Sequence, residues 1–371
     1  MRTKIGDIMR NSFNRNIRNI VKKMLTMRKE LITSKYMKIR RKKYKKNVKN
    51  YQPLTSSERK AYLKFWKEST GINVKLGLPY AELIKNTSGS FKVETFPHYL
   101  FHTNLINLLN DKSTIIANTD KNFLKVRIGK DAIENLIVYA NGLFFDNLSK
   151  IISEEQANHI IADYEFIVLK KGLSVRGSGQ DVKFVDTKIM NFNMEKGKEI
   201  YPHNFLIQKK LTQSSTMKSF NDTSINTIRI TSLLLKTGNV SVLGAVVRFG
   251  KKGSMYDNAH QGGKFVSVSS AGITSSIARD QNGIGYTQKE IDNNFSAIQI
   301  PNWNLIIELI NRNHPKFPYQ RIVAWDIVLD ENNIPFILEV NLNAPSLWLH
   351  DFDNGFTFGD ETKEMLQLIK R

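Results

Sequence analysis

The chain has no cysteine among its 371 residues, which excludes disulfide bonds, thiolate metal sites and a cysteine nucleophile. It also lacks a long uninterrupted apolar run, and the basic start Met1-Arg2-Thr3-Lys4 leads into none. The sequence therefore predicts neither a signal peptide nor a transmembrane segment. We expect a cytoplasmic protein of two or three domains, and a peripheral position at the inner face of the membrane stays open as an alternative.

Acidic residues are scarce in the first fifty positions, which hold 18 lysines and arginines against 2 acids. This segment alone contributes +16 to the net charge of +21, because the remaining chain carries 37 basic against 32 acidic residues. A strongly basic chain invites a nucleic-acid interpretation. Here that interpretation applies to residues 1–50 only, since the body is close to ordinary in charge.

Apolar residues recur at three- and four-residue steps between Ile5 and Ile32, with lysines and arginines between them. This spacing predicts a basic amphipathic helix, which leads into a still more basic run from Lys35 to Lys49. Its apolar face either packs on the body or a partner subunit, which is the most frequent case, or lies on an anionic membrane surface. Binding of nucleic acid is the third interpretation, but no aromatic interleaving or known motif supports it, so we expect no such partner.

Beyond residue 50, short strands, glycine turns and helices alternate. The predicted fold class is therefore α+β, with antiparallel strands in the second half of the chain. Thr55 and Glu58 fit the start of a helix over residues 55–70, and a second helix is expected over residues 298–311. Strands are expected at residues 166–169, 227–235 and 240–249.

Two apolar runs separated by a polar, asparagine-rich break predict a β-hairpin over residues 322–341. A turn centred just after Asn332 places Asp326 opposite Glu339, and Asn341 shares the face of Glu339. Two carboxylates side by side in a core are costly unless a cation neutralises them. A small set of oxygen ligands suits Mg²⁺ shared with substrate phosphates. A solvated hairpin face with incidental acids is the alternative.

Other segments carry groups that suit anionic ligands. Lys170 ends a strand candidate and precedes a Gly/Ser loop. Together they could bind phosphate, although an ordinary surface turn fits equally well.

Arg229 and Arg248 are expected near the same end of an antiparallel strand pair. Their planar guanidinium groups suit phosphate or carboxylate oxygens, and surface salt bridges are the alternative. The loop from Asp257 to Gly263 has polar side chains before a glycine pair, which indicates closure over a ligand.

Taken in order, these features resemble the ATP-grasp superfamily, and more narrowly the sugar-transfer-associated ATP-grasp proteins of bacterial polysaccharide gene clusters. The similarity runs from about residue 55 to the end of the chain, so the basic extension lies outside it. It rests on Asp120-Lys121-Asn122, Lys170 with its glycine loop, Asn226-Thr227-x-Arg229, Arg248, Asp257-Asn258-x-x-x-Gly262-Gly263, Asp326 and Glu339-x-Asn341.

The resemblance implies two ATP-grasp subdomains (121–205 and 206–371), which grip ATP between them. A mixed α/β region (51–120) would precede them, after the basic helical extension (1–50) that charge and periodicity predict.

The resemblance also implies a set of ligands. Nucleotide contacts would come from the lysines on the α- and β-phosphates, a mobile flap, a hinge at the adenine and a closing loop, namely Lys121, Lys170, Gly177, Ser178, Gly179, Gln208, Lys210 and Asn258. Two Mg²⁺ ions would be held by Asp326, Glu339 and Asn341, with Glu339 bridging. Arg229 and Arg248 would face the γ-phosphate and the acyl phosphate formed from it.

The implied activity is a two-step ligation, in which ATP activates a carboxylate and an amine or similar nucleophile displaces phosphate. The expected substrates are small or sugar-linked carboxylates and amines, on a cell-surface polysaccharide or its precursor. Two departures from the family pattern are visible: Gln208 replaces an acid that often precedes the hinge, and Ala344-Pro345 stands where many relatives have Pro-Gly. The alternatives are a kinase of a sugar or small-molecule hydroxyl, and a scaffold protein that acts through its basic N-terminal arm.

Overall fold

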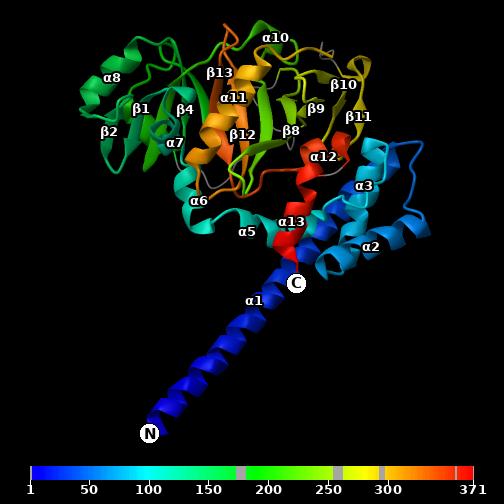
Figure 1. Cartoon of the computed structure of the whole chain (residues 1–371). Helices are drawn as coiled ribbons and strands as arrows, with labels where there is room; N and C mark the ends of the chain where they lie inside the picture. Colours follow the sequence, from blue (N-terminus) through cyan, green and yellow to red (C-terminus); the bar gives the residue numbers. More distant parts are fainter. Residues whose placement is uncertain (1, 173–180, 254–261, 292–296, 356, 371) are drawn as a thin grey trace. The chain divides into compact units, whose positions relative to one another are not determined.

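The computed structural model describes residues 2–172, 181–253, 262–291, 297–355 and 357–370, with side chains described from Ile20 onward (Figure 1). The chain divides into two compact units. The first combines Met1–Leu108 with Asp351–Arg371, and the second is Leu109–His350. The domain boundaries predicted at residues 50, 120 and 205 stay predictions.

The first unit is helical. The long helix predicted at the N-terminus is present, and so is the helix predicted after Thr55, whose side chain accepts from the Glu58 amide in a capping box. Residues 51–120, all of them described, hold helices and no strand, so the expected mixture of α and β there is wrong. The helices are α1 (Arg2–Asn47), α2 (Ser56–Thr70), η1 (Lys75–Gly77), α3 (Leu78–Ser88), α4 (His98–Leu100), the π-helix η2 (Phe101–Leu105), α5 (Ile106–Leu109), α12 (Trp348–Asn354), η7 (Gly359–Glu361) and α13 (Thr362–Ile369), of which α5 and α12 cross into the second unit.

None of the described helices combines the length and hydrophobicity that crossing a bilayer requires.

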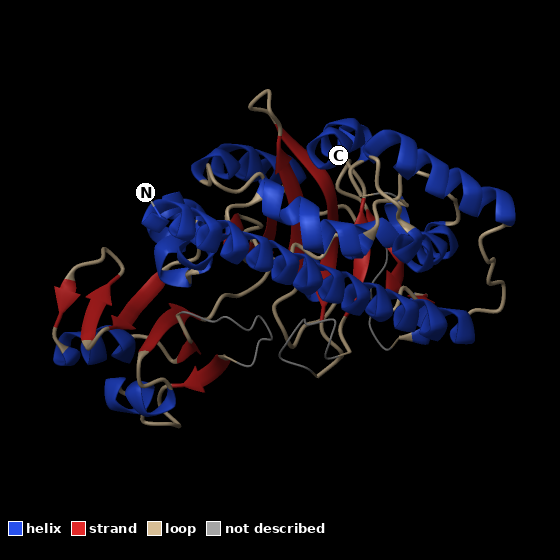
Figure 2. Ribbon diagram, turned by 90° about the horizontal axis from the view of Figure 1, so that it is seen from below, coloured by secondary structure: helices blue, strands red, loops and turns tan. Residues whose placement is uncertain are grey.

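The second unit contains a six-stranded antiparallel sheet in the order β3-β2-β1-β6-β4-β5. Figure 2 shows helices against one face of this sheet. Ala157, Ile161 and Met194 of these helices pack with alternate strand residues such as Ile167 and Ile207 in one buried core. The elements are β1 (Asn135–Ala140), β2 (Leu143–Asp146), β3 (Ile151–Ile152), α8 (Glu154–Ala162), β4 (Phe166–Lys170), β5 (Val182–Asp186), α9 (Met194–Ile200) and β6 (Asn204–Lys209).

A seven-stranded antiparallel sheet follows, in the order β11-β10-β9-β8-β7-β12-β13. Its strands are β7 (Thr227–Leu234), β8 (Val240–Phe249), β9 (Lys264–Val268), β10 (Thr274–Arg279), β11 (Gly285–Tyr286), β12 (Ile322–Leu329) and β13 (Pro335–Asn341). The helices of this part are α6 (Lys112–Thr119), α7 (Lys121–Ile128), η3 (Gly129–Asp131), α10 (Ser215–Lys218), η5 (Gln288–Glu290), α11 (Trp303–Asn313) and η6 (His314–Lys316).

Helix α11 begins at Trp303, five residues later than the predicted start at residue 298. Pro301 disfavours helical backbone at the residue before it. Ile298 and Ile300 instead exchange backbone hydrogen bonds with Thr274 and Gly272. The apolar residues that look like a first helical turn thus pair beside β10, and the helix starts after Asn302.

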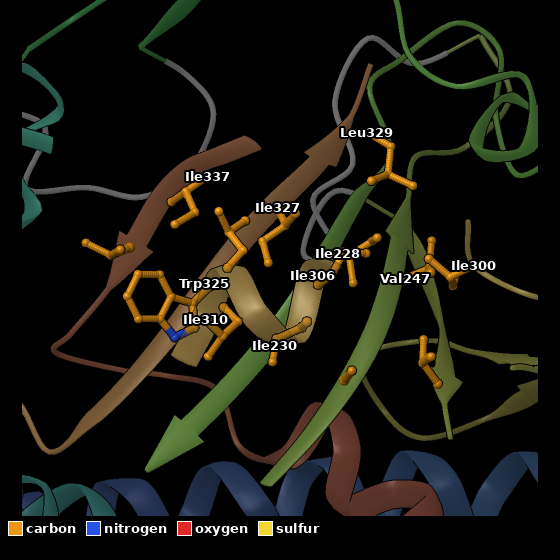
Figure 3. Close-up of a cluster of buried hydrophobic side chains, with 14 of the residues drawn as sticks. Ile228, Ile230, Val247, Ile300, Ile306, Ile310, Trp325, Ile327, Leu329 and Ile337 are labelled. Carbon is orange, nitrogen blue, oxygen red and sulfur yellow. The ribbon is translucent and has the colours of Figure 1, made fainter. Parts of the chain in front are cut away.

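The core of the seven-stranded sheet lies on the face covered by α11. Ile306 and Ile310 of the helix lie against Ile230, Trp325 and Ile327 of the sheet (Figure 3). Because side chains alternate along a strand, the even-numbered positions of β12 and the odd-numbered positions of β7 face the other side. That second face carries the polar residues described next.

Candidate active site

The hairpin β12–β13 has the predicted partners at its functional end. Asp326 lies opposite Glu339 and Ala324 opposite Asn341, which confirms the expected pairing. Nearer the turn, however, Ile327 pairs with Ile337, so Leu338 is an extra residue on β13. The turn therefore centres on Asn332, half a residue earlier than predicted. A β-bulge at Leu338 shifts the register by one residue, so that Glu339 still lies opposite Asp326.

The bulge also decides which way the metal-ligand candidates point. Ile337 lies in the core with Val340 and Leu342. In a regular strand every second residue after Ile337 would enter that core, which would bury Glu339 and Asn341 among aliphatic side chains. The extra residue reverses the alternation, so both polar side chains face away from the core.

Asp326 is the centre of the site and is 2% exposed. Arg229, which lies opposite it on β7, donates from Nε and Nη2 to its two carboxylate oxygens, with Nη2 2.8 Å from Oδ2. Nη1 of Arg248 is 3.3 Å from each oxygen, and Nδ2 of Asn341 is 3.3 Å from Oδ2. Three strands besides β12 thus send a donor to one carboxylate.

The two arginines lie near the same end of β7 and β8, as predicted, but not directly opposite each other. Arg248 pairs with Thr227, and Arg229 pairs with Val246. The turn lies earlier than assumed, because Leu235 and Asn239 close it and Gly238 adopts a positive φ of 88°. The arginines are therefore diagonal neighbours on one face, close enough to share Asp326.

Charge and burial set the protonation of the carboxylate pair. Burial alone would raise the pKa of Asp326, but the guanidinium groups of Arg229 and Arg248 outweigh it and hold that pKa well below its usual range. Burial raises the pKa of Glu339, and the charge of Asp326 raises it further, against the opposing pull of Lys121. Of the two carboxylates, Glu339 is therefore the one that binds a proton more readily.

The two predicted lysines come from a helix and from the other sheet. Lys121 is the first residue of α7, which Asp120 caps, and its Nζ lies 3.6 Å from Oε2 of Glu339. Lys170 ends β4 and is 8% exposed. Burial lowers its pKa from 10.5 to about 8, Lys121 lowers it as well, and Glu339 opposes the shift. Glu339 thus joins both lysines electrostatically to the hairpin.

Gly172, two residues after Lys170, lies close to the start of α7. A Cβ on Gly172 would lie 2.7 Å from Nδ2 of Asn122, the second residue of α7. A side chain at this position would therefore require the Asn122 side chain to move. The predicted nucleotide contacts that come next in the loop, Gly177, Ser178 and Gly179, lie outside the described residues, as does Asn258.

Gln208 of β6 is buried, and its Nε2 donates to Oδ1 of Asn135 at 2.8 Å. Asn135 in turn donates to the Lys121 carbonyl at 3.4 Å. Lys210 lies just past the end of β6, exposed, with its ammonium 4.7 Å from the Phe166 ring centre. Sequence reasoning missed Asn135, because its only signal was a polar residue at the start of an apolar run, which is common at strand ends.

Two apolar residues missed by the sequence analysis share the face of Lys170 and Gln208. Val168 pairs with Gln208, and Leu206 pairs with Lys170. Both are buried, and neither belongs to the core on the other side of the sheet. An apolar surface bordered by an amide and a lysine is suited to a flat heterocycle that carries phosphates.

The donor chemistry of the hairpin fits a hard divalent cation. Two carboxylates and one amide oxygen lie on adjacent strands, and burial together with the charge of Asp326 raises the pKa of Glu339, a shift that a bound cation would oppose. Among the described residues no cluster of three or more His, Cys, Asp or Glu side chains is arranged to hold a metal alone. Asp326, Glu339 and Asn341 would thus hold Mg²⁺ only together with substrate oxygens, as is usual for this ion.

Comparison with protein families matches residues 100–365, more than half of the chain, to the family described as sugar-transfer associated ATP-grasp. No curated protein matches the chain.

Several solved structures are similar to the chain. They include the ATP-grasp ligase PsnB complexed with minimal precursor, at 11% identity over 70% of this chain and 64% of that chain, with a TM-score of 0.40. N5-carboxyaminoimidazole synthetase from Staphylococcus aureus complexed with ADP is 9% identical over 69% of this chain and 54% of that chain, with a TM-score of 0.41. L-amino acid ligase from Bacillus licheniformis is 14% identical over 68% and 49%, with a TM-score of 0.38. The chain thus spans 49% to 64% of the length of these structures.

Proposed function

The chain belongs to the sugar-transfer associated ATP-grasp family, and from this premise we propose that it is an ATP- and Mg²⁺-dependent ligase. It activates a carboxylate as an acyl phosphate, and an amine or similar nucleophile then displaces the phosphate. The acceptor is a cell-surface polysaccharide or a precursor of one, in keeping with the family's association with sugar transfer. Both substrates are small or sugar-linked molecules.

One observation carries this proposal. Two adjacent carboxylates, Asp326 and Glu339, are surrounded by cationic side chains that come from four separate elements. A purely structural ion pair needs one partner for each charge, whereas this group gathers Arg229, Arg248, Lys121 and Lys170 about two acids. Such an excess of positive charge beside a candidate metal site suits a polyphosphate.

In the first step, an oxygen of the substrate carboxylate attacks the γ-phosphorus of ATP. The bond between that phosphorus and the β–γ bridging oxygen breaks, and ADP leaves with the electron pair. Lys121 and Lys170 hold the α- and β-phosphates, while Gln208 and the backbone at Lys210 lie at the adenine. Arg229 and Arg248 neutralise charge on the transferred phosphoryl group, which is where most of the catalytic effect of such a site arises.

In the second step, the nucleophile attacks the acyl carbon. Inorganic phosphate leaves with the carbon–oxygen electron pair, and the proton of the attacking amine passes to solvent. The arginines hold the departing phosphate as they held the phosphoryl group. Bound by Asp326, Glu339 and Asn341, Mg²⁺ would neutralise phosphate oxygens and fix their orientation.

Product analysis tests the reaction class. The purified chain is supplied with ATP, Mg²⁺ and paired libraries of carboxylates and amines, including nucleotide-linked uronic acids, and ADP and inorganic phosphate are measured. The proposal predicts equal amounts of both, and release that depends on the carboxylate. ADP without inorganic phosphate, together with a phosphorylated hydroxyl acceptor, would identify a kinase and refute the ligase.

A matched pair of variants on the hairpin ties the reaction to the site. Glu339→Gln is expected to lower the turnover of ATP by at least about a hundredfold. Glu331→Gln makes the same chemical change at an exposed position in the turn and is expected to match the parent. Equal loss in both variants would show that the hairpin, rather than the Glu339 carboxylate, had been disturbed.

A further inference from the structure

Helix α1 exposes a group of large apolar side chains along one side, where Arg28 is the one charged residue among them. Between Ile20 and Ile32, seven large apolar side chains are exposed by about half or more: Ile20, Val21, Met24, Leu25, Met27, Leu31 and Ile32. At about 100° per residue, Ile20, Met24 and Leu31 fall within roughly 40° of one another around the helix axis. We call these seven residues the apolar face of α1.

The helices of the first unit do not cover this face. From Ile20 onward, the buried side chains of α1 are Ser34, Met37, Arg40 and Tyr44, and Ser34 and Tyr44 donate to the carbonyls of Leu76 and Asn86. Met37, Arg40 and Tyr44 lie roughly opposite Ile20, Met24 and Leu31 around the helix axis, and Ser34 lies about one turn further along the helix than Leu31, at the edge of their side. The expectation that this face packs on the body of the chain or on a partner subunit is thus not met by the helices of the first unit for residues 20–32, and otherwise stays a prediction.

Lysines continue the same face toward the end of the helix. Lys35, Lys38 and Lys42 are exposed and lie in the same arc as Ile20 and Met24. Glu30 is the only acid in α1 from Ile20 onward, and it lies outside this arc. One side of the helix is thus mostly apolar for three turns and basic for the next turns.

We propose that this side of α1 docks on an anionic lipid surface, with the apolar face among the acyl chains and the lysines at the lipid phosphates. Both attractions act in the same direction, because both groups lie on one side of the helix. The inference rests on α1 alone and does not depend on the ligase reaction.

Two other partners, a second copy of the chain and nucleic acid, fit this side of α1 less well. A second copy of the chain would bring another segment of net charge +16 against the first, so pairing of two apolar faces would be opposed by repulsion. Nucleic acid would satisfy the lysines but would leave seven exposed apolar side chains in water. An anionic bilayer satisfies both groups.

Vesicle flotation of the full chain tests the proposal. Vesicles with equal parts of phosphatidylglycerol and phosphatidylcholine should carry the protein, and vesicles of phosphatidylcholine alone should carry far less. Replacing Ile20, Met24 and Leu31 by glutamine preserves charge and helix propensity and should weaken partition by on the order of a hundredfold. Replacing Lys35, Lys38 and Lys42 by glutamine should weaken it comparably and reduce its salt dependence.

The matched control carries the same substitution on another exposed apolar surface. Ile116, Phe123 and Val126 are 66%, 55% and 69% exposed on α6 and α7. Replacing these three by glutamine should leave vesicle binding unchanged. Equal loss in this control would show that binding follows general hydrophobicity and would overturn the assignment to α1.

Because the chain has no cysteine, a single introduced thiol can report the depth of each side of the helix. An environment-sensitive dye on Met24→Cys should shift to the blue when anionic vesicles are added, and the same dye on Lys22→Cys, on the opposite side, should not. Equal shifts at both positions would contradict the proposed orientation. A dimer that dissociates on substitution of the apolar face, or binding of DNA without vesicle binding, would overturn the proposal.

Discussion

Asp326 is a buried acid whose charge two arginines require. Arg229 is 8% exposed and forms two hydrogen bonds to it, and Arg248 adds contacts at 3.3 Å. Buried guanidinium groups without a counter-charge are strongly destabilising. The residue that is proposed to bind metal therefore also stabilises the fold in the absence of ligand.

Asp326→Asn keeps the size of the side chain and removes its charge. We expect the free energy of unfolding to fall by about 3 kcal/mol, because the buried Arg229 and the partly buried Arg248 lose their carboxylate. Urea denaturation measures the change. Glu331→Gln, an exposed loss of the same charge, should change the free energy by less than about 0.5 kcal/mol. Similar small effects of both substitutions would show that the arginines do not depend on Asp326.

We expect Lys170 to link nucleotide binding to proton uptake. Its pKa of about 8 in the ligand-free protein leaves it mostly neutral at higher pH. Phosphate oxygens favour the charged form, so binding should raise the pKa back toward 10.5. We expect an uptake of about 0.9 proton per ATP near pH 9, falling toward zero at about pH 6.5.

Calorimetry of ATP binding in buffers of different ionisation enthalpy measures this uptake. Lys170→Met should abolish it. Lys171→Met removes the neighbouring exposed lysine and should leave it intact. Proton release on binding, or an uptake that survives in Lys170→Met, would contradict the assignment of Lys170 as a phosphate contact.

The neighbours of a single residue were predictable from the sequence where both partners lie on one hairpin, because the pairing of its strands can be counted from the turn. The pairing of Asp326 with Glu339 follows from counting along one hairpin. The contact of Lys121 with Glu339 does not, because it joins residues far apart in the chain and depends on where the start of α7 lies relative to the hairpin. Asn135 was missed for the same reason, since its partner Gln208 is on a strand that no local pattern connects to it.

At the scale of elements, prediction succeeded where the signal lies within the element itself. The start of α2 is a capping box, visible as Thr55 followed three residues later by Glu58. The start of α11 was predicted wrongly, because the pairing of Ile298 and Ile300 beside β10 is a long-range effect. The bulge at Leu338 was not predicted either. A regular β13 and a β13 with one extra residue have the same sequence, and they differ only in which side chains enter the core.

Because Leu338 is an extra residue in β13, its deletion should preserve the pairing of the hairpin. Removing Leu338 leaves Ile337 and Val340 in the core and Glu339 opposite Asp326, so the fold should survive with a loss of about 1 kcal/mol. Removing Val340 instead turns Asn341 into the core and should cost several kcal/mol or prevent folding. Urea denaturation of the two variants compares them. Equal destabilisation by both deletions would contradict the register described for β13.

At the scale of the whole molecule, the charge distribution separates two roles. The family match covers residues 100–365 and contains every residue of the proposed ATP site, whereas the basic segment 1–50 lies outside it. Composition alone indicated this separation, because the net charge beyond residue 50 is small. Composition could not indicate that the apolar face of α1 stays exposed, since exposure depends on which side of the helix the other helices contact.

Equilibrium binding of ATP, with and without Mg²⁺, tests the proposed ATP site without any knowledge of the acceptor. The parent chain should bind ATP at least about tenfold more tightly when Mg²⁺ is present, and Glu331→Gln should behave in the same way. Glu339→Gln should lose this dependence on Mg²⁺. If the parent failed to bind ATP with Mg²⁺, or Glu339→Gln kept the full effect of the metal, the hairpin of Asp326, Glu339 and Asn341 would not be the metal end of an ATP site.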